Sequence, residues 1–308
     1  MPLEKHSSCK VNLLLNILGK RPDGFHELET VLHPVGLDDS LTFQRQGART
    51  RLSCNDPLLP TDSRNLVFAA AGLFLNTAGI REGVRIHLEK RIPISAGLGG
   101  GSANAAATLL ALNELFGHPL APDALLQLAA ALGSDVPFFL QDRPALSTGR
   151  GEIITPLDFF PALAGSWLVL VHPGFGVSTA WAYEQLDRQP DGLHGKPGRA
   201  QHLISLLRTV DLPAAGRQFF NSLEAPVLRK YPLLELFQEF FRQNGAPATL
   251  MSGSGSTTFA VTSTRAAAET LLEKFKAKFG SGMWTAIVPS ENFSQPRGEP
   301  QETRRAWT

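Results

Sequence analysis

The sequence has little cysteine, little net charge and no long apolar run, and each of these shortages excludes a class of protein. Its two cysteines, Cys9 and Cys54, form no CxxC pair and no regular spacing, which argues against a disulfide scaffold and against a zinc site. With 29 basic and 28 acidic residues the net charge is +1, so no overall field attracts nucleic acid or an anionic membrane. The longest apolar stretch, 66–75, is too short to span a bilayer.

The first residues also lack the charged-then-apolar order of a signal peptide, and no repeat of solenoid length is visible. A chain of 308 residues, 43% of them hydrophobic and 19% charged, is typical of a globular protein. We therefore expect a cytoplasmic protein, a monomer or weak homodimer, that binds neither nucleic acid nor membrane.

Hydrophobic periodicity predicts a mixture of strands and helices in two halves. In the first half we expect strands over 10–18, 40–45, 50–54 and 84–92, the second and third joined by a turn at 46–48. Helices are expected over 63–79, 102–116 and 122–132, the first capped by Ser63 and ended by Gly79.

The pattern restarts after residue 155, which predicts one domain over 1–155, a second over 156–290 and a mobile tail over 291–308. In the second half we expect helices over 178–186, 199–210, 214–228, 233–245 and 265–280, the last ending at Gly280. Strands are expected over 166–173 and 283–289, and a strand–turn–strand unit over 248–263. A loop rich in glycine and proline covers 187–199.

One glycine cluster carries the first functional signal. The segment PISAGLGGGSANAAATL, residues 93–109, places four glycines between a predicted strand and an alanine-rich predicted helix. Glycines let successive backbone N–H groups converge on an anion, and a helix N-terminus adds unpaired donors and partial positive charge. Ser102 is expected either to cap this helix or to face a phosphate or Mg²⁺. The arrangement predicts an anion site.

Two common phosphate loops do not fit this segment. The Walker loop needs a lysine before its serine or threonine, but Ser102 follows Gly101 directly. The dinucleotide motif G-x-G-x-x-G fails because Ser102 also stands where its third glycine belongs. A purely structural glycine turn is the alternative, and it is less typical of four clustered glycines than of a single pair. The ligand class stays open at this point.

The same segment resembles the phosphate-loop motif of the GHMP kinases, P-x-x-x-G-L-G-[SG]-[SG]-S-A. Two other segments resemble the remaining motifs of that family and occur in the same order, KVNLLLNILGKRPDGFHELET at 10–30 and LMSGSGSTTFAV at 250–261. RPDGFHELET, together with GSDVPFFL at 133–140, is similar to the members that phosphorylate 4-diphosphocytidyl-2-C-methyl-D-erythritol.

The resemblance implies an α+β fold of two domains, ribosomal protein S5 domain 2-like at the N-terminus and ferredoxin-like at the C-terminus. It implies transfer of the γ-phosphate of ATP to the 2-hydroxyl of the cytidyl diphosphate substrate, a step of non-mevalonate isoprenoid synthesis, with ATP and Mg²⁺ as cofactors. No metal-ligand motif is visible, and none is expected, because Mg²⁺ often binds through phosphates and water. The alternatives are a homoserine or mevalonate kinase and a non-catalytic nucleotide-binding relative.

The resemblance also implies the catalytic residues. Asp135 is the expected base, and Lys10 is expected beside it, where an ammonium stabilises a carboxylate and polarises the attacking hydroxyl. Asn12 lies two residues along the strand from Lys10, so both side chains point to the same face and reach the same substrate. Read without the motif, Asp135 would be a turn residue before a proline-containing strand, and Lys10 a solvated surface lysine.

Substrate recognition is assigned to distant segments. Cytosine is expected between the rings of Phe25, which replaces the tyrosine common in the family, and Tyr183, with His26 hydrogen-bonded to its edge. Further substrate contacts are assigned to Thr179 and to the turn residues Gly253, Ser254 and Gly255. That turn closes over the diphosphate, supports the phosphate loop, or is a plain hairpin. The ATP site is assigned to Asn65, Leu66, Lys90, Pro93, Ala96, Gly97, Leu98, Gly99, Gly100, Gly101, Ser102 and Ala103.

Overall fold

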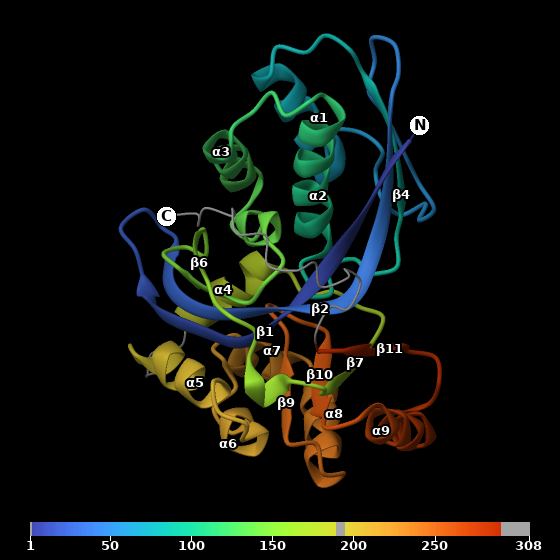
Figure 1. Ribbon diagram of the computed structural model, residues 1–308. Helices are drawn as coiled ribbons and strands as arrows, with labels where there is room; N and C mark the ends of the chain where they lie inside the picture. The colour runs from blue at the N-terminus through green and yellow to red at the C-terminus, as the bar shows by residue number, and fades with distance from the viewer. Residues whose placement is uncertain (1, 189–194, 291–308) are drawn as a thin grey trace.

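Two β-sheets form the frame of the protein (Figure 1). The computed structural model describes residues 2–188 and 195–290, so the predicted tail at 291–308 and part of the predicted loop at 187–199 lie outside the described residues. Within them the first sheet has seven strands, in the order β3-β4-β2-β1-β8, and in addition β5 pairs with β2 and β6 pairs with β5. The second sheet has four strands, in the order β11-β7-β10-β9.

The strands are β1 (Leu3–Lys20), β2 (His26–Arg45), β3 (Arg51–Cys54), β4 (Val84–Glu89), β5 (Ala145–Thr148), β6 (Ile153–Pro156), β7 (Trp167–His172), β8 (Phe220–Asn221), β9 (Ala248–Met251), β10 (Thr258–Thr262) and β11 (Trp284–Pro289). The α-helices are α1 (Leu66–Thr77), α2 (Gly100–Leu115), α3 (Pro122–Leu132), α4 (Thr179–Asp187), α5 (Arg199–Leu207), α6 (Leu212–Gly216), α7 (Glu224–Lys230), α8 (Pro232–Gln243) and α9 (Arg265–Phe279). Two short 3-10 helices, η1 (Pro137–Leu140) and η2 (Pro161–Leu163), complete the elements. No helix of the described part of the chain has the length and apolar character needed to cross a bilayer.

The long antiparallel pair of β1 and β2 joins the two lobes of the molecule and crosses its middle (Figure 1). Cys9, Val11 and Leu13 of β1 pack into the core between the two sheets. The intervening side chains, Lys10 and Asn12, point to the opposite face, as the strand period requires. Register shifts in the pairing occur at Ser8/Cys9 and Asn12/Leu14, on both sides of these two residues, and such bulges re-aim side chains near functional sites.

The N-terminal lobe packs α1, α2 and α3 against the sheet, and its core joins Phe43 of β2 and Ile86 of β4 to Ala106 and Leu109 of α2. Small alanine side chains let α2 lie close to the strands, which brings the N-terminus of α2 to the middle of the molecule (Figure 1).

The C-terminal lobe has the expected ferredoxin-like topology. Chain order β7–helices–β9–β10–α9–β11 with sheet order β11-β7-β10-β9 is the split β-α-β-β-α-β arrangement. Along β7, Leu168 and Leu170 face the core shared with the first sheet, whereas Val169 and Val171 pack under α8 and α9. The strict alternation follows from the two-residue period of a strand that is covered on both faces.

Three local predictions are wrong. The predicted helix over 214–228 is instead α6, β8 and α7, because Asn221 extends to pair with Leu15 of β1 and breaks the helix. The strands around 40–54 do not form a hairpin. β4 inserts between β2 and β3, and Gly47 accepts a hydrogen bond from the N–H of Gly83 at 2.7 Å. Helix α1 is capped by Asn65 and not by Ser63, since Asn65 is extended and accepts the N–H of Val67.

The predicted domain boundary after residue 155 falls at β6. The chain beyond it builds the second sheet but also returns β8 to the first, where it pairs in parallel with β1. The division into 1–155 and 156–290 therefore stays a proposal about folding units.

Candidate active site

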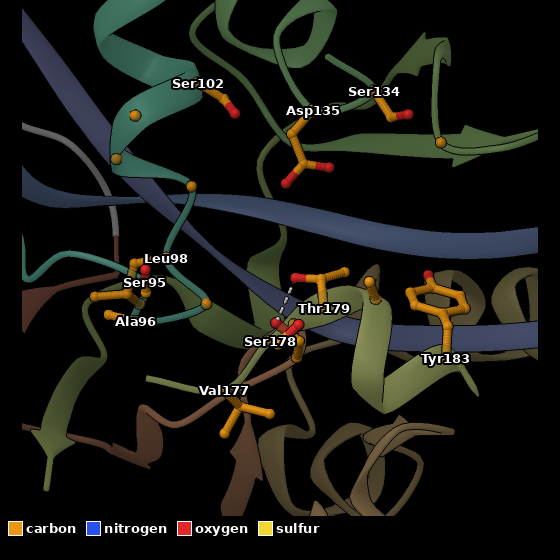
Figure 2. Close-up of a pocket in the computed structure, with 18 of the residues that line it drawn as sticks. Ser95, Ala96, Leu98, Ser102, Ser134, Asp135, Val177, Ser178, Thr179 and Tyr183 are labelled. Carbon is orange, nitrogen blue, oxygen red and sulfur yellow. Dashed lines mark hydrogen bonds between the residues drawn. The ribbon is translucent and has the colours of Figure 1, made fainter. Parts of the chain in front are cut away.

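A cavity of about 1140 Å³ lies where β1, the N-terminus of α2 and the N-terminus of α4 meet, and all but two of the predicted site residues line it (Figure 2). The two exceptions are Ala103 and Gly255. Ala103 is on the face of α2 that packs into the core, with 2% exposure. A Cβ on Gly255 would come within 2.6 Å of the sulfur of Met251, so this glycine faces β9 rather than the cavity.

Gly97 and Gly99 shape the phosphate loop, defined here as residues 93–102. Their φ angles are +78° and +71°, in the left-handed region that favours glycine. A Cβ on Gly97 would lie 2.0 Å from the carbonyl oxygen of Ser252, and one on Gly99 would lie 2.8 Å from Cζ of Phe139 and 3.2 Å from Cε of Lys10. Both positions therefore require glycine for space as well as for conformation.

The loop ends in the N-terminus of α2, as predicted, but the capping expectation for Ser102 is wrong. Helix α2 begins at Gly100 with Gly99 as its N-cap, so Ser102 is already in the first turn. The Ser102 side chain lines the cavity, on the same side as Asp135 (Figure 2). With its first-turn N–H groups unpaired, α2 directs partial positive charge into the cavity.

The glycine turn between β9 and β10 supports the phosphate loop. Ser252 donates its hydroxyl to the carbonyl oxygen of Gly97 at 2.9 Å, and the N–H of Thr257 donates to the carbonyl oxygen of Ala96 at 3.1 Å. The hydroxyls of Ser254 and Thr179 lie 2.9 Å apart, which ties the same turn to α4 (Figure 2). The segment is a hairpin turn, and it also holds two elements of the cavity wall together.

Lys10 and Asp135 lie side by side, as predicted. Nζ of Lys10 is 3.5 Å from Oδ2 of Asp135, and it donates to Oδ1 of Asn12 at 2.6 Å and to the carbonyl oxygen of Gly97 at 3.3 Å. The Lys10 side chain is 4% exposed and that of Asp135 is 42% exposed. A buried cation with these partners is held in place, while the carboxylate opens to the cavity.

A tight turn positions Asp135. The N–H of Val136 donates to the carbonyl oxygen of Gly133 at 3.1 Å, and the chain then enters the 3-10 helix η1 rather than the expected strand. Val136 and Phe138 are buried in the core on either side of Pro137. These two anchors leave Asp135 pointing into the space between Ser102 and Thr179 (Figure 2).

Asn65, Leu66 and Lys90, which were predicted to belong to the ATP site, line the cavity, but the polar groups of Asn65 and Lys90 already have protein partners. Asn65 caps α1 through its Oδ1 and donates Nδ2 to the carbonyl oxygen of Pro60 at 2.8 Å. Lys90 forms an ion pair of 2.5 Å with Asp39, and the two side chains are 6% and 0% exposed. The contribution of these residues to a ligand surface is therefore mainly their shape and backbone.

The predicted cytosine-side residues gather at the other end of the cavity. Phe25 is 51% exposed, and the guanidinium of Arg150 covers one face of its ring at 4.6 Å from the ring centroid. Tyr183 packs against His26 with ring centroids 4.8 Å apart. Burial raises the pKa of the Tyr183 hydroxyl, and the negative charge of Asp135 raises it further.

Sequence patterns missed several residues of this site. Arg150 and Asp187 line the cavity and contact the predicted pocket residues Phe25 and His26. Asp39 is fully buried and holds Lys90. None of the three belongs to a short motif, so only tertiary contacts reveal them.

Comparisons with known proteins agree with this geometry. The chain matches the family model for the GHMP kinases N terminal domain over residues 65–143 and that for the GHMP kinases C terminal over residues 203–281. It is 42% identical to the 4-diphosphocytidyl-2-C-methyl-D-erythritol kinase of Gloeobacter violaceus over 85% of this chain and 86% of that protein. The corresponding kinase of Pelotomaculum thermopropionicum is 40% identical over 87% of this chain and 92% of its own.

Solved structures are similar to this chain in the same way as the curated relatives. A crystal structure of 4-(cytidine 5'-diphospho)-2C-methyl-D-erythritol kinase has a TM-score of 0.77 and 35% identity, covering 93% of this chain and 99% of that one. A homoserine kinase from Cytophaga hutchinsonii has a TM-score of 0.75 at 21% identity over 94% of this chain and 95% of its own, a likeness that shows the fold alone. Because the sequence likeness extends over more than four fifths of its length, the chain belongs to the 4-diphosphocytidyl-2-C-methyl-D-erythritol kinase family of the GHMP kinases.

Proposed function

We propose that this protein transfers the γ-phosphate of ATP to the 2-hydroxyl of 4-diphosphocytidyl-2-C-methyl-D-erythritol, a step of the non-mevalonate route to isoprenoid precursors. The main observation that supports this proposal is the position of the Lys10–Asp135 pair. It lies in one cavity with the phosphate loop and with the aromatic group of Phe25, His26 and Tyr183. A kinase needs the phosphate donor and the acceptor hydroxyl to meet at such a pair.

The phosphate loop and α2 bind the ATP phosphates in this proposal. Backbone N–H groups of the loop and of the first turn of α2 donate to phosphate oxygens, and the helix N-terminus adds partial positive charge. Helix α4 also begins at the cavity, at Thr179 after its N-cap Ser178, and offers a second N-terminus to the diphosphate of the acceptor. Two helix ends suit a reaction in which both substrates carry phosphates.

Asp135 accepts the proton of the acceptor hydroxyl as that oxygen attacks the γ-phosphorus and the bond to the β-phosphate oxygen breaks, which releases ADP. Lys10 stabilises the negative charge that develops on the transferred group and stays in place because Asn12 and Gly97 accept its hydrogen bonds. A positioned base contributes on the order of 10²–10⁴-fold to such a rate.

Magnesium completes the proposed chemistry by neutralising charge on the ATP phosphates when it is bound. The described residues contain no group of three or more acidic, histidine or cysteine side chains that could hold a metal ion by themselves. They fit an ion that would be held mainly by phosphates and water, with the hydroxyl of Ser102 as an oxygen donor facing the cavity.

A direct assay tests the proposal. The protein is incubated with Mg-ATP and the cytidyl diphosphate acceptor, and ADP release is followed together with the new phosphomonoester signal by phosphorus NMR. We expect turnover of this acceptor and none of homoserine or mevalonate. Turnover of homoserine or mevalonate without turnover of the cytidyl compound would show that the specificity is wrong. ATP binding without any phosphoryl transfer would favour the non-catalytic alternative.

Two further expectations are part of the proposal but are not used in the mechanism. They are a cytoplasmic location and a monomeric or weakly dimeric state. Light scattering across a range of protein concentrations measures the oligomeric state, and fractionation of the native host measures the location.

A further inference from the structure

Asp187 connects α4 to the hairpin of β1 and β2 at the cytosine end of the cavity. Oδ1 of Asp187 lies 2.6 Å from Nε2 of His26, and its Oδ2 accepts a hydrogen bond from Nζ of Lys20 at 2.5 Å. The His26 and Asp187 side chains are 10% and 25% exposed. Three elements thus meet at one carboxylate, and His26 is held by it on one side and by the ring of Tyr183 on the other.

The contact decides which ring nitrogen of His26 carries a hydrogen. Burial alone would raise the pKa of the Asp187 carboxyl, but the hydrogen bonds from Lys20 and His26 outweigh it and the pKa is lowered. The group is therefore a carboxylate and only accepts, so Nε2 of His26 must be the donor. In the neutral ring Nδ1 then has a free lone pair, and among the described residues no side chain or backbone group hydrogen-bonds to it.

A hydrogen-bond acceptor at Nδ1 of His26 can distinguish cytosine from uracil. Cytosine carries an amino donor at position 4 of its ring, where uracil carries a carbonyl acceptor. A neutral Nδ1 can accept the amino group of cytosine, whereas against uracil two acceptors would face each other without a hydrogen between them. A site built to pair with a polar group discriminates strongly against an analogue that lacks it.

We propose that Asp187 is a positioning residue that fixes the ring of His26 as the Nε2–H tautomer, and that this tautomer selects cytosine over uracil in the acceptor. The inference rests on the proposed function for the identity of the acceptor. Asp187 itself does not touch the base. It acts through His26, so a test must show that the effect of Asp187 depends on His26.

The first test compares acceptors. The kinase is assayed with the cytidyl acceptor and with its uridyl analogue, using the wild type, Asp187→Ala and the control Asp158→Ala, an aspartate whose side chain is 96% exposed and does not line the cavity. In Asp187→Ala we expect KM for the cytidyl acceptor to rise about tenfold, and the preference for cytidyl to fall by a similar factor. KM for ATP stays unchanged, and the Asp158→Ala control behaves as the wild type.

The second test asks whether Asp187 acts through His26. In a His26→Ala background, Asp187→Ala is expected to cause no further loss, because the group that it orients is gone. Asp187→Asn should keep part of the preference, since its amide oxygen can still accept from Nε2. Nitrogen-15 NMR of labelled histidine should show Nδ1 unprotonated in the wild type and a changed signal in Asp187→Ala.

These results separate the two proposals. Turnover of the cytidyl acceptor with an unchanged base preference in Asp187→Ala, or additive losses in the double variant, would overturn the inference and leave the function intact. Without turnover in the wild type the function would fail. In that case calorimetry with CDP and UDP decides the inference, which requires CDP to bind more tightly than UDP and the difference to shrink in Asp187→Ala.

Discussion

The ammonium of Lys10 lies 3.5 Å from the carboxylate of Asp135, yet the two side chains are 4% and 42% exposed. This difference in burial agrees with the separate tasks that we propose for the two side chains. Lys10 donates to Asn12 and to the carbonyl oxygen of Gly97, so it cannot swing away without leaving a buried charge unpaired. Asp135 has no comparable burial and faces the cavity, which makes it the partner that can reach a substrate hydroxyl.

Asp135→Asn is expected to lower kcat on the order of 10²–10⁴-fold while KM for ATP stays within about twofold. The amide keeps the shape of the side chain but cannot take a proton. Steady-state kinetics measures the effect, and Asp142→Asn, a change at an exposed aspartate outside the cavity lining, is the matched control. A loss smaller than about tenfold would mean that positioning alone carries the transfer.

Gly97→Ala is expected to destabilise the protein and weaken ATP binding. An alanine there would be strained at a φ of +78° and would place its Cβ 2.0 Å from the carbonyl oxygen of Ser252. The left-handed conformation alone costs on the order of 1–3 kcal/mol, and the close approach adds displacement of the loop. Urea unfolding and KM for ATP measure the two effects.

Gly101→Ala is the matched control for the unfolding measurement. Gly101 lies in the first turn of α2, and a Cβ there would meet only Cδ1 of Leu66, at the ordinary contact distance of 3.7 Å. We expect the free energy of unfolding to stay the same or to rise by up to about 1 kcal/mol, because alanine favours the helix. An equal loss of stability in Gly97→Ala and Gly101→Ala would contradict the steric explanation.

Asp39→Asn is expected to lower the free energy of unfolding by about 3–5 kcal/mol. Asp39 is fully buried and accepts hydrogen bonds from Nζ of Lys90 at 2.5 Å and from the N–H groups of Arg91 and Ile92 at 2.7 and 2.9 Å. The amide would leave the buried Lys90 ammonium without a counter-charge. Urea unfolding measures the loss.

Two controls accompany the Asp39 experiment. Asp62→Asn breaks an exposed ion pair with Arg64 and is expected to change stability very little. Adding Lys90→Met to Asp39→Asn should restore part of the lost stability, because it removes the unpaired charge. If the single Asp39 variant were as stable as the wild type, the pair would not be a structural element.

Stability should fall as the pH is lowered from about 6.5 to about 4, in part because of His33. His33 is buried, and burial lowers its pKa to about 4, against the opposing hydrogen bond of 2.7 Å to the carbonyl oxygen of Ser290. The unfolded chain binds the proton more tightly in this interval, so unfolding is favoured by an amount on the order of 3 kcal/mol when the interval is crossed.

Urea unfolding at several pH values checks this prediction. His33→Gln does not titrate and should show a flatter dependence between pH 6.5 and 4 than the wild type. Identical slopes in the two proteins would assign the acid sensitivity to carboxyl groups instead of His33.

The sequence predicted helices and strands correctly where the local hydrophobic pattern and the tertiary environment agree. The alternation of Val84, Ile86 and Leu88 predicted β4, and the apolar run of 166–173 predicted β7. The stretch 214–228 was misread because an isolated strand of two residues, Phe220–Asn221, forms only through pairing with β1. Such a strand has no periodicity of its own, so no window of sequence can contain its signal.

Local sequence predicted a glycine loop followed by a helix, because clustered glycines favour a tight turn and alanines favour a helix, and motif resemblance predicted that Lys10 and Asp135 lie side by side. The hydrogen-bond partners of the predicted site residues are set by the tertiary structure. Ser252 reaches Gly97 across 155 positions, Asp187 reaches His26 across 161, and Asp39 reaches Lys90 across 51. Hydrogen bonds between such distant positions depend on which strands pair and on how helices and loops pack against them, and chain-local propensity carries no information about that arrangement.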